Sequence, residues 1–386
     1  MNRKKIIYFG IPAFAIAIAA AILLIMSGGE VSDEISVPSE TGDMPHTTTE
    51  GLMSEEFPLP LSEDELNGLE PSAEPASEEA EPVSTPTNEP IPTTSSVLEE
   101  RFVVALKSTQ EDVAAALVEK GFVTDKEAFL AAFEKESGAV APGGYHLSKD
   151  MSPAEVAEAL RAAPYMKWVI IPEGLRKEEV ADILGNALGW SADTEEKWIS
   201  VYSRMKYDYV DGVYFPDTYL LPVAESPLDT TNRILAKFNE KFAPYLPQFA
   251  AQNIKWTTGL TLASIVQREA ASNADMPLIA GILWNRLEAG MTLGVDATLQ
   301  YVRGDTGKGW WAPASAADKK LDSPYNTYIY KGLPPHPISN PGIPAIEAVL
   351  EPAETDCLYY LHDDDRVTHC AATYEGHLDN IEKYLK

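Results

Sequence analysis

The chain has 386 residues, of which 59 are Asp or Glu and 30 are Lys or Arg, so its formal net charge at pH 7 is −29. An acidic chain repels the phosphates of nucleic acids, which excludes DNA and RNA as partners and disfavours anionic ligands in general. The length allows two or three domains, although the composition changes strongly along the chain.

The first 26 residues predict a membrane anchor. Residues 1–5 (MNRKK) carry three positive charges, and residues 6–26 are a run of 21 residues without a charged side chain, long enough to cross a bilayer as one helix. The run is longer than the core of a typical signal peptide, and no clear cleavage site follows it. Because the basic residues come first, we expect a cytoplasmic tail at 1–5, a single transmembrane helix at 6–26 and an extracytoplasmic location, at the cell membrane, for everything that follows.

Residues 27–98 differ from both their neighbours. They contain 17 Asp and Glu, no Lys or Arg, and 10 Pro, interleaved with Ser, Thr and Ala. Such a segment cannot bury enough apolar surface to offset the entropy that ordering would cost. We expect a disordered acidic stalk that holds the rest of the protein away from the membrane.

Residues 99–165 predict a small subdomain of strands and helices. A strand at 101–107 precedes a helix that we expect to be capped by Ser108 and ended by Gly121, and a second strand at 145–147 precedes a helix capped by Ser152. The order of strand, polar turn and short helix is typical of glycan-binding modules of the LysM type, which residues 121–164 loosely resemble. A packing subdomain without a ligand explains the pattern equally well.

Residues 166–386 predict a domain with mixed helical and β structure, so that we expect an α+β protein overall. The predicted elements are a strand at 168–171 and a helix after it, a loop or edge strand at 211–222, helices starting near Pro227, Thr258 and Pro277, and a strand at 296–302.

The segment from Cys357 to Cys370 (CLYYLHDDDRVTHC) predicts a hairpin. A two-residue turn at Asp363 and Asp364 would place the two Cys opposite one another, where they could form a disulfide in an exported protein. The alternative is two unrelated buried thiols. A count of free thiols on the unreduced protein distinguishes the two.

The stretch ASIVQREA (263–270) places three polar residues at the end of an apolar run. A helix turns about 100° per residue, so Glu269 lies within about 20° of Leu262 on the apolar side, whereas Gln267 and Arg268 point elsewhere. A carboxyl group on a buried side must be paired or kept neutral by a raised pKa. Either Glu269 forms an ion pair with Arg286 on the next helix, or it is a general acid.

The residues downstream of Glu269 favour a sugar ligand. Residues 325–335 (YNTYIYKGLPP) are rich in Tyr, Asn and Thr, which offer stacking faces and neutral hydrogen bonds. The His residues follow no metal-binding spacing such as HExxH, and we expect neither a metal nor another cofactor.

Several of these blocks resemble the YceG-like, or MltG-type, family of endolytic murein transglycosylases. LTLASIVQREA, ILWNRLEAGMTLGVDATLQY, SPYNTYIYKGLPPHPISNPG, IEAVLEPA and HCAATYEGHLDNIEKYLK match the family in order, and DGVYFPDTYLLP is similar to the loop that precedes its catalytic helices. The resemblance implies cleavage of the bond between N-acetylmuramic acid and N-acetylglucosamine within peptidoglycan strands, with a 1,6-anhydromuramic end. It also implies glycan strands, and wall-synthesis enzymes of the membrane, as partners.

The resemblance assigns roles to particular residues. Many relatives carry two glutamates in the block matched by QREA, and since Gln267 replaces the first, the catalytic role passes to Glu269. Cys357 and Cys370 stand where aromatic residues are common, which favours the disulfide. Within the matched blocks we expect substrate-binding side chains at Asp296, Thr298, Gln300, Tyr325, Asn326, Thr327, Tyr328 and Asn340.

Two other functions compete with this interpretation. An ordinary muramidase would use Asp296 as nucleophile or water activator and would add water to the product. A membrane-tethered wall-binding scaffold would carry the same blocks without using Glu269 for catalysis.

Overall fold

The computed structural model describes residues 99–134, 139–202 and 211–385. The predicted cytoplasmic tail, transmembrane helix and stalk lie outside these residues. Within the described part, no helix is both long enough and apolar enough to span a membrane. The described residues mix helices and sheets, which confirms the predicted α+β class.

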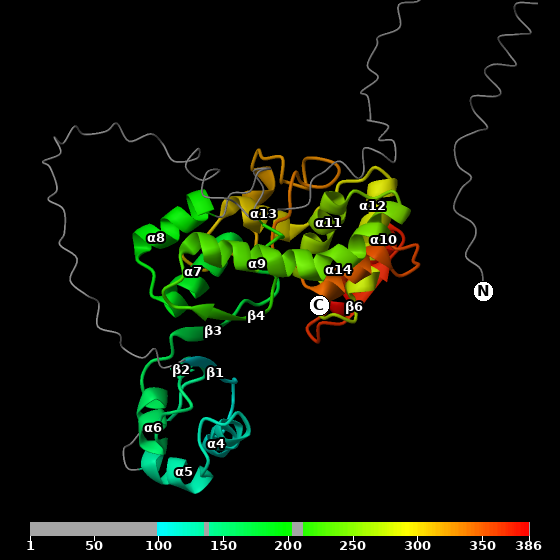
Figure 1. The fold of residues 1–386 in the computed structure, drawn as a ribbon. Helices are drawn as coiled ribbons and strands as arrows, with labels where there is room; N and C mark the ends of the chain where they lie inside the picture. Colours follow the sequence, from blue (N-terminus) through cyan, green and yellow to red (C-terminus); the bar gives the residue numbers. More distant parts are fainter. Residues whose placement is uncertain (1–98, 135–138, 203–210, 386) are drawn as a thin grey trace, which may run out of the picture. The chain divides into compact units, whose positions relative to one another are not determined.

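The residues before the third strand form a cluster of short elements with its own core (Figure 1). These elements are β1 (Glu100–Val104), α4 (Gln110–Glu119), α5 (Lys126–Glu134), β2 (Gly143–Leu147) and α6 (Pro153–Arg161). Their buried side chains include Phe102, Leu117, Phe129, Phe133, Leu147 and Leu160. The helix α5 was not predicted, and the cap of α4 is Thr109 rather than Ser108, because Thr109 and Asp112 form a reciprocal capping box.

Four antiparallel strands form one sheet in the order β1-β2-β3-β4, where β3 is Met166–Ile170 and β4 is Thr218–Pro222. Residues 211–222 were predicted to be a loop or an edge strand. Residues 218–222 of this segment form β4, which lies at the edge of the sheet. β2 and β3 pair at Gly144 and Met166. A side chain at Gly143 would place its Cβ 2.4 Å from the Met166 carbonyl oxygen, so this approach of the two strands requires glycine.

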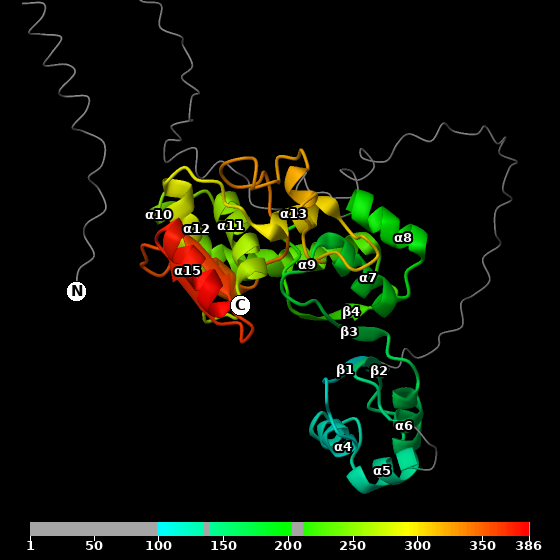
Figure 2. The same cartoon turned by 180° about the vertical axis from the view of Figure 1, so that it is seen from behind.

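The remaining elements are mostly helical (Figures 1 and 2). They are α7 (Lys177–Leu188), α8 (Ala192–Lys197), a π-helical turn (Trp198–Tyr202), α9 (Pro227–Phe242), α10 (Leu246–Ala251), α11 (Trp256–Glu269), α12 (Met276–Glu288), α13 (Asp296–Arg303), α14 (Ile343–Leu350) and α15 (Tyr374–Tyr384). α11 packs against α12, α13 and α14, and its residues 259–266 are buried on every side. It is therefore the central helix of the larger core.

The prediction of a strand at 296–302 is wrong, because these residues form α13. Gly294 adopts φ +59°, which turns the chain before the helix, and Asp296 occupies the first turn, where a carboxylate is favourable. Seven residues of alternating polarity fit either type of element, and these local signals decide for the helix.

The predicted hairpin is present as β5 (Tyr359–His362) and β6 (Thr368–Ala371), and α15 (red in Figure 2) packs on both strands. Its predicted turn is wrong. The connection covers residues 363–367, with Arg366 at φ +63°, so that Cys370 pairs with Tyr360 and not with Cys357. Asp363 shapes this longer loop by accepting a hydrogen bond from the Val367 amide at 2.8 Å.

Candidate active site

Glu269 is the last residue of α11 and is half-buried. The chain leaves the helix at Ala270, whose backbone is extended. Gln267 and Arg268 point elsewhere, as predicted, but they do not face solvent. Gln267 Oε1 accepts a hydrogen bond from the Gly342 amide at 3.0 Å, and Arg268 Nη1 donates to the Gly174 carbonyl at 3.2 Å. The helix angle therefore correctly places Glu269 on a different side of α11 from Gln267 and Arg268. The loops before α7 and α14 cover the side that carries Gln267 and Arg268.

The carboxyl group of Glu269 is surrounded by polar groups, few of which carry a charge. The Tyr360 hydroxyl donates to Oε2 at 2.5 Å, and the backbone of Ala297, in the first turn of α13, supplies a further hydrogen bond. Burial raises the pKa of Glu269, and the negative charge of Asp296 raises it further, while the two hydrogen bonds and His362 oppose the shift. Its net pKa is raised, which favours the protonated form that a general acid requires.

The alternative ion pair between Glu269 and Arg286 is wrong. Arg286 Nε donates to the Leu358 carbonyl at 2.5 Å, and its Nη1 donates to the carbonyl of Leu293. Its guanidinium also lies over the Tyr359 ring, 5.5 Å from the centroid. Among the described residues, no ion pair joins Arg286 to Glu269, so the cation holds backbone in place instead of neutralising the carboxylate.

Asp296 is the first residue of α13 and is exposed. It accepts a hydrogen bond from the Tyr328 hydroxyl at 2.6 Å. Burial, and then this hydrogen bond to a carboxylate, raise the pKa of Tyr328. Since Asp296 also raises the pKa of Glu269, the structure brings two carboxyl groups and two tyrosines, Tyr328 and Tyr360, to one place.

Two of the predicted substrate-binding residues, Thr298 and Thr327, are buried. Thr298 Oγ1 donates to the Val295 carbonyl at 2.8 Å, and Thr327 Oγ1 accepts from the Val295 amide at 3.0 Å. The two hydroxyls also lie within hydrogen-bonding distance of each other, at 2.9 Å. Their side chains hold the start of α13 against the loop at 323–330.

Asn326 and Asn340 are also buried and structural. Asn326 Nδ2 donates to the carbonyl of Leu321 at 2.8 Å. Asn340 Oδ1 accepts from the amides of Gly212 and Tyr214 at 2.9 and 2.8 Å, and its Nδ2 donates to a carbonyl of the loop before α7. The substrate-binding prediction for Thr298, Thr327, Asn326 and Asn340 is therefore not supported by where their side chains lie.

Tyr325 and Gln300 are half-buried and remain open to a ligand in part. The Tyr325 ring packs beside that of Tyr301, with 5.1 Å between centroids, and burial raises the pKa of Tyr325 to about 12. The Gln300 side chain makes no hydrogen bond to another described residue. Of the eight predicted substrate-binding residues, Asp296, Tyr328, Tyr325 and Gln300 thus keep accessible polar groups.

Sequence analysis missed Tyr360, whose hydroxyl donates a hydrogen bond to Glu269. Because the register of the hairpin was predicted wrongly, nothing in the sequence distinguished Tyr360 from its neighbours on the strand. Sequence analysis also missed a buried group next to the site. The Tyr301 hydroxyl donates to Asp211 Oδ2 at 2.7 Å, the Lys177 amide donates to Oδ1 at 2.8 Å, and Arg176 lies over the Tyr301 ring.

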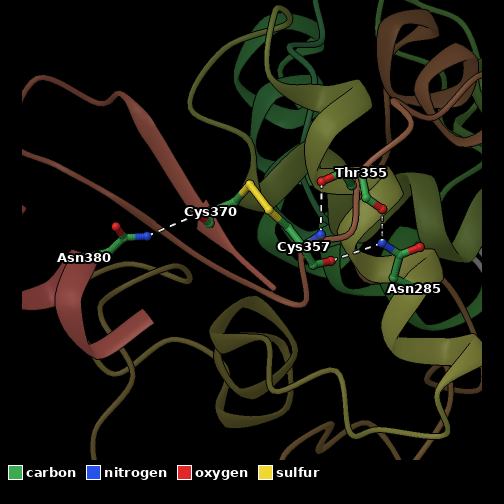
Figure 3. The surroundings of a disulfide bond; sticks show 5 residues. All are labelled: Asn285, Thr355, Cys357, Cys370 and Asn380. Carbon is green, nitrogen blue, oxygen red and sulfur yellow. Dashed lines mark hydrogen bonds between the residues drawn. A yellow bond between two sulfur atoms is a disulfide. The ribbon is translucent and has the colours of Figure 1, made fainter. Parts of the chain in front are cut away.

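Cys357 and Cys370 form a disulfide in the structure (Figure 3). Their Cα atoms are 5.8 Å apart, within the range of ordinary disulfides. Figure 3 shows that the bridge joins β6 to the segment that leads from α14 into β5. Asn285 Nδ2, on α12, donates to the Cys357 carbonyl at 3.1 Å and to the Thr355 carbonyl at 2.7 Å.

Comparisons with known proteins identify the family of this chain. The model of the YceG-like family matches residues 102–383. The endolytic murein transglycosylase of Streptococcus pneumoniae serotype 2 (strain D39) is 26% identical over 277 residues, covering 63% of this chain and 50% of that protein. The endolytic murein transglycosylase of Bacillus subtilis (strain 168) is 27% identical over 295 residues, covering 70% and 81%. The chain spans about half the length of the pneumococcal relatives that it matches.

A crystal structure of a yceG-like protein from Listeria monocytogenes resembles the fold, with a TM-score of 0.51 and 24% sequence identity. It covers 73% of this chain and 98% of the Listeria chain. This likeness concerns the fold alone.

Proposed function

Because this chain belongs to the YceG-like family, we propose that it is an endolytic lytic transglycosylase of peptidoglycan. It cleaves the bond between N-acetylmuramic acid and N-acetylglucosamine within glycan strands and leaves a 1,6-anhydromuramic end. The observation that carries the proposal is Glu269, a half-buried carboxyl with a raised pKa and no cationic partner in an ion pair among the described residues. The names of the streptococcal and Bacillus relatives support the same reaction.

One carboxyl group is sufficient for the chemistry. Protonated Glu269 donates its proton to the glycosidic oxygen as the bond from the anomeric carbon to that oxygen breaks. The resulting carboxylate then takes the proton of the muramic 6-hydroxyl while O6 bonds to the anomeric carbon. Glu269 ends protonated, no water is consumed, and the next turnover can begin.

The surrounding residues favour each stage of this cycle. Burial favours the protonated form of Glu269 before the first step, and the hydrogen bonds from Tyr360 and Ala297 stabilise the carboxylate after it. Asp296, exposed and bonded to Tyr328, places a negative charge beside the oxocarbenium-like transition state. Tyr325, Tyr328 and Gln300 offer the polar and aromatic groups for sugar binding.

The proximity of Asp296 to Glu269 also favours a second candidate, a muramidase in which Asp296 activates water or attacks the sugar. The two functions differ by one water molecule in the product. Mass spectrometry of peptidoglycan digested with the full chain separates them. We expect anhydro ends, whereas products heavier by one water and without anhydro ends would establish the muramidase.

We expect Glu269→Gln to lower cleavage at least about 100-fold, because the amide keeps the shape of the side chain but cannot donate an acidic proton. Glu288→Gln, at the exposed end of α12, is the matched control and should cleave like the wild type. Thermal unfolding checks the folding of both variants. Retained cleavage by Glu269→Gln would point to a wall-binding scaffold, and a large loss of thermal stability would give Glu269 a structural role.

The proposal extends to the rest of the chain. A single transmembrane helix at 6–26 anchors the protein in the cell membrane, and the acidic stalk at 27–98 sets its reach into the wall, as the charge pattern of these residues supports. Residues 99–165 form a LysM-like subdomain that contacts glycan, supported by their separate core and their alternation of strands and helices. Residues 166–386 form the catalytic domain, which acts during wall assembly beside wall-synthesis enzymes of the membrane.

A further inference from the structure

The contact between Tyr360 and Glu269 joins two parts of the chain that are 91 residues apart. Tyr360 lies on β5, where it pairs with Cys370 of β6. Its neighbour Tyr359 makes different contacts, because successive side chains of a strand point to opposite faces. The Tyr359 ring lies 5.8 Å from that of Tyr374 on α15.

The hairpin is anchored to the active-site helix at its loop end. Asp275, in the turn between α11 and α12, accepts from the Ala271 amide at 3.0 Å and from Thr368 Oγ1 at 2.9 Å. His362 Nε2 lies 3.2 Å from the same oxygen, Oδ2. Burial raises the pKa of Asp275, but the hydrogen bonds from Ala271, Ser272 and Thr368 outweigh it and lower the pKa to about 2, so the anchor stays charged.

The hairpin is anchored a second time at its open end. The Cys357–Cys370 disulfide fixes the entry to β5 against β6, and Asn285 ties the Cys357 carbonyl to α12 (Figure 3). On the other side, Asn380 Nδ2 of α15 donates to the Cys370 carbonyl at 3.2 Å. Tyr360 therefore stands between two fixed points, opposite one of the bridged cysteines.

We propose that Tyr360 is a positioning residue for the Glu269 carboxyl group, and that the Cys357–Cys370 bridge keeps it in register. The hydroxyl fixes the rotation of the carboxyl group by donating to Oε2, and it stabilises the carboxylate that remains after proton donation. The role in catalysis rests on the proposed function, whereas the effect on the carboxyl group does not.

The pH dependence of the site follows from the groups that face Glu269. Tyr360 and His362 face it from β5, Asp296 from α13 and Tyr328 from the loop at 323–330. Arg268 points away from Glu269 on the same helix and interacts with it only electrostatically. Removing the Tyr360 hydroxyl removes a donor that favours the charged form, so the pKa of Glu269 rises further. Because the first step needs protonated Glu269, the alkaline limb of the pH profile moves to higher pH, even as the rate falls.

Tyr360→Phe tests the proposal, with Tyr359→Phe as the matched control on the same strand. We expect Tyr360→Phe to lower kcat/KM on purified glycan strands about 10-fold or more, with most of the loss in kcat, and to shift the alkaline limb upward. Tyr359→Phe should change neither. If the two variants have the same rate and the same alkaline limb, the proposal is overturned.

A second measurement does not require activity. It is a ¹³C NMR titration of the full chain with labelled glutamate side chains. The carboxyl signal that is missing from the spectrum of Glu269→Gln is assigned to Glu269. In Tyr360→Phe, the titration of this signal should move to higher pH. An unmoved titration overturns the proposal. If this titration moves while the wild type gives no anhydro ends, the proposed function fails and the positioning role of Tyr360 on the carboxyl group stands.

The bridge is tested by Cys357→Ala combined with Cys370→Ala. The unreduced wild type should show no reactive thiol, and the double variant should lose kcat/KM in the same direction as Tyr360→Phe, by a smaller factor. Two reactive thiols in the folded wild type, or a double variant with unchanged rate and alkaline limb, would overturn the role of the bridge.

Discussion

Glu269 and Asp211 are both carboxyl groups removed from water, but their partners differ. Asp211 is buried and accepts from the Lys177 amide and the Tyr301 hydroxyl, and Arg176 is close enough to lower its pKa. Glu269 is half-buried, with one hydroxyl donor and the Ala297 backbone. Asp211 thus has the partners of a structural carboxylate, while Glu269 is more exposed and has no cation in an ion pair among the described residues.

Asp211→Asn should reduce the pH dependence of stability. Burial raises the pKa of Asp211 from its ordinary 3.8 to about 6. Because the folded state binds the Asp211 proton more tightly than the unfolded state, protonation of this group stabilises the fold. This stabilisation is fully present below pH 3.8 and is lost as the pH rises through 6, by about 3 kcal/mol in all. Denaturant titrations at pH 4, 6 and 8 should show this loss in the wild type and little of it in the variant. Asp193→Asn, at an exposed position of α8, is the control, and equal slopes for all three proteins would contradict the assignment.

At the scale of elements, local signals determined what could be predicted. Ser152 with Pro153 starts α6, and Gly290 at φ +62° ends α12, because cap geometry depends on a few neighbouring residues. The side of α11 that carries Glu269 also followed from helix periodicity. α13 was predicted as a strand, because its alternating polarity fits both types of element and the burial of residues 297–299 against the rest of the fold is not visible in the sequence.

The site as a whole was predictable only in part for the same reason. Asp296 and Tyr328 lie beside Glu269, but Thr298, Thr327, Asn326 and Asn340 carry polar side chains that serve the fold. Composition suggests sugar binding for all of them, because it cannot separate a polar group that faces a ligand from one that satisfies a buried loop.

Thr327→Val should therefore affect stability and not substrate binding. The substitution keeps the shape but leaves the buried Val295 amide without its acceptor, which should cost about 1–3 kcal/mol of unfolding free energy. The KM for glycan should stay within about twofold of the wild type. Thr306→Val, in the exposed loop after α13, is the control and should change neither quantity. A variant of normal stability with a much higher KM would return Thr327 to the substrate-binding residues.

At the scale of the whole molecule, the charges are distributed in a way that fits the proposed location. Residues 1–5 carry the only positive charges before Arg101, and residues 27–98 carry 17 negative charges without a positive one. A glycan backbone is uncharged, so the acidic charge of this chain does not oppose the proposed binding of glycan, whereas it does oppose binding to polyanions.

The charges at Arg3, Lys4 and Lys5 should determine the orientation of the chain in the membrane. With a phosphatase that is active only outside the cytoplasm fused after residue 386, the wild-type chain should be membrane-bound and give high activity. Replacing all three by Gln removes the only basic residues near the apolar run, so the activity per chain should fall as orientations mix. Exchanging Arg for Lys and Lys for Arg at these positions preserves the charge and should preserve the activity. A wild-type chain recovered in the soluble fraction would contradict the anchor, and full activity in the Gln variant would contradict the role of the charges.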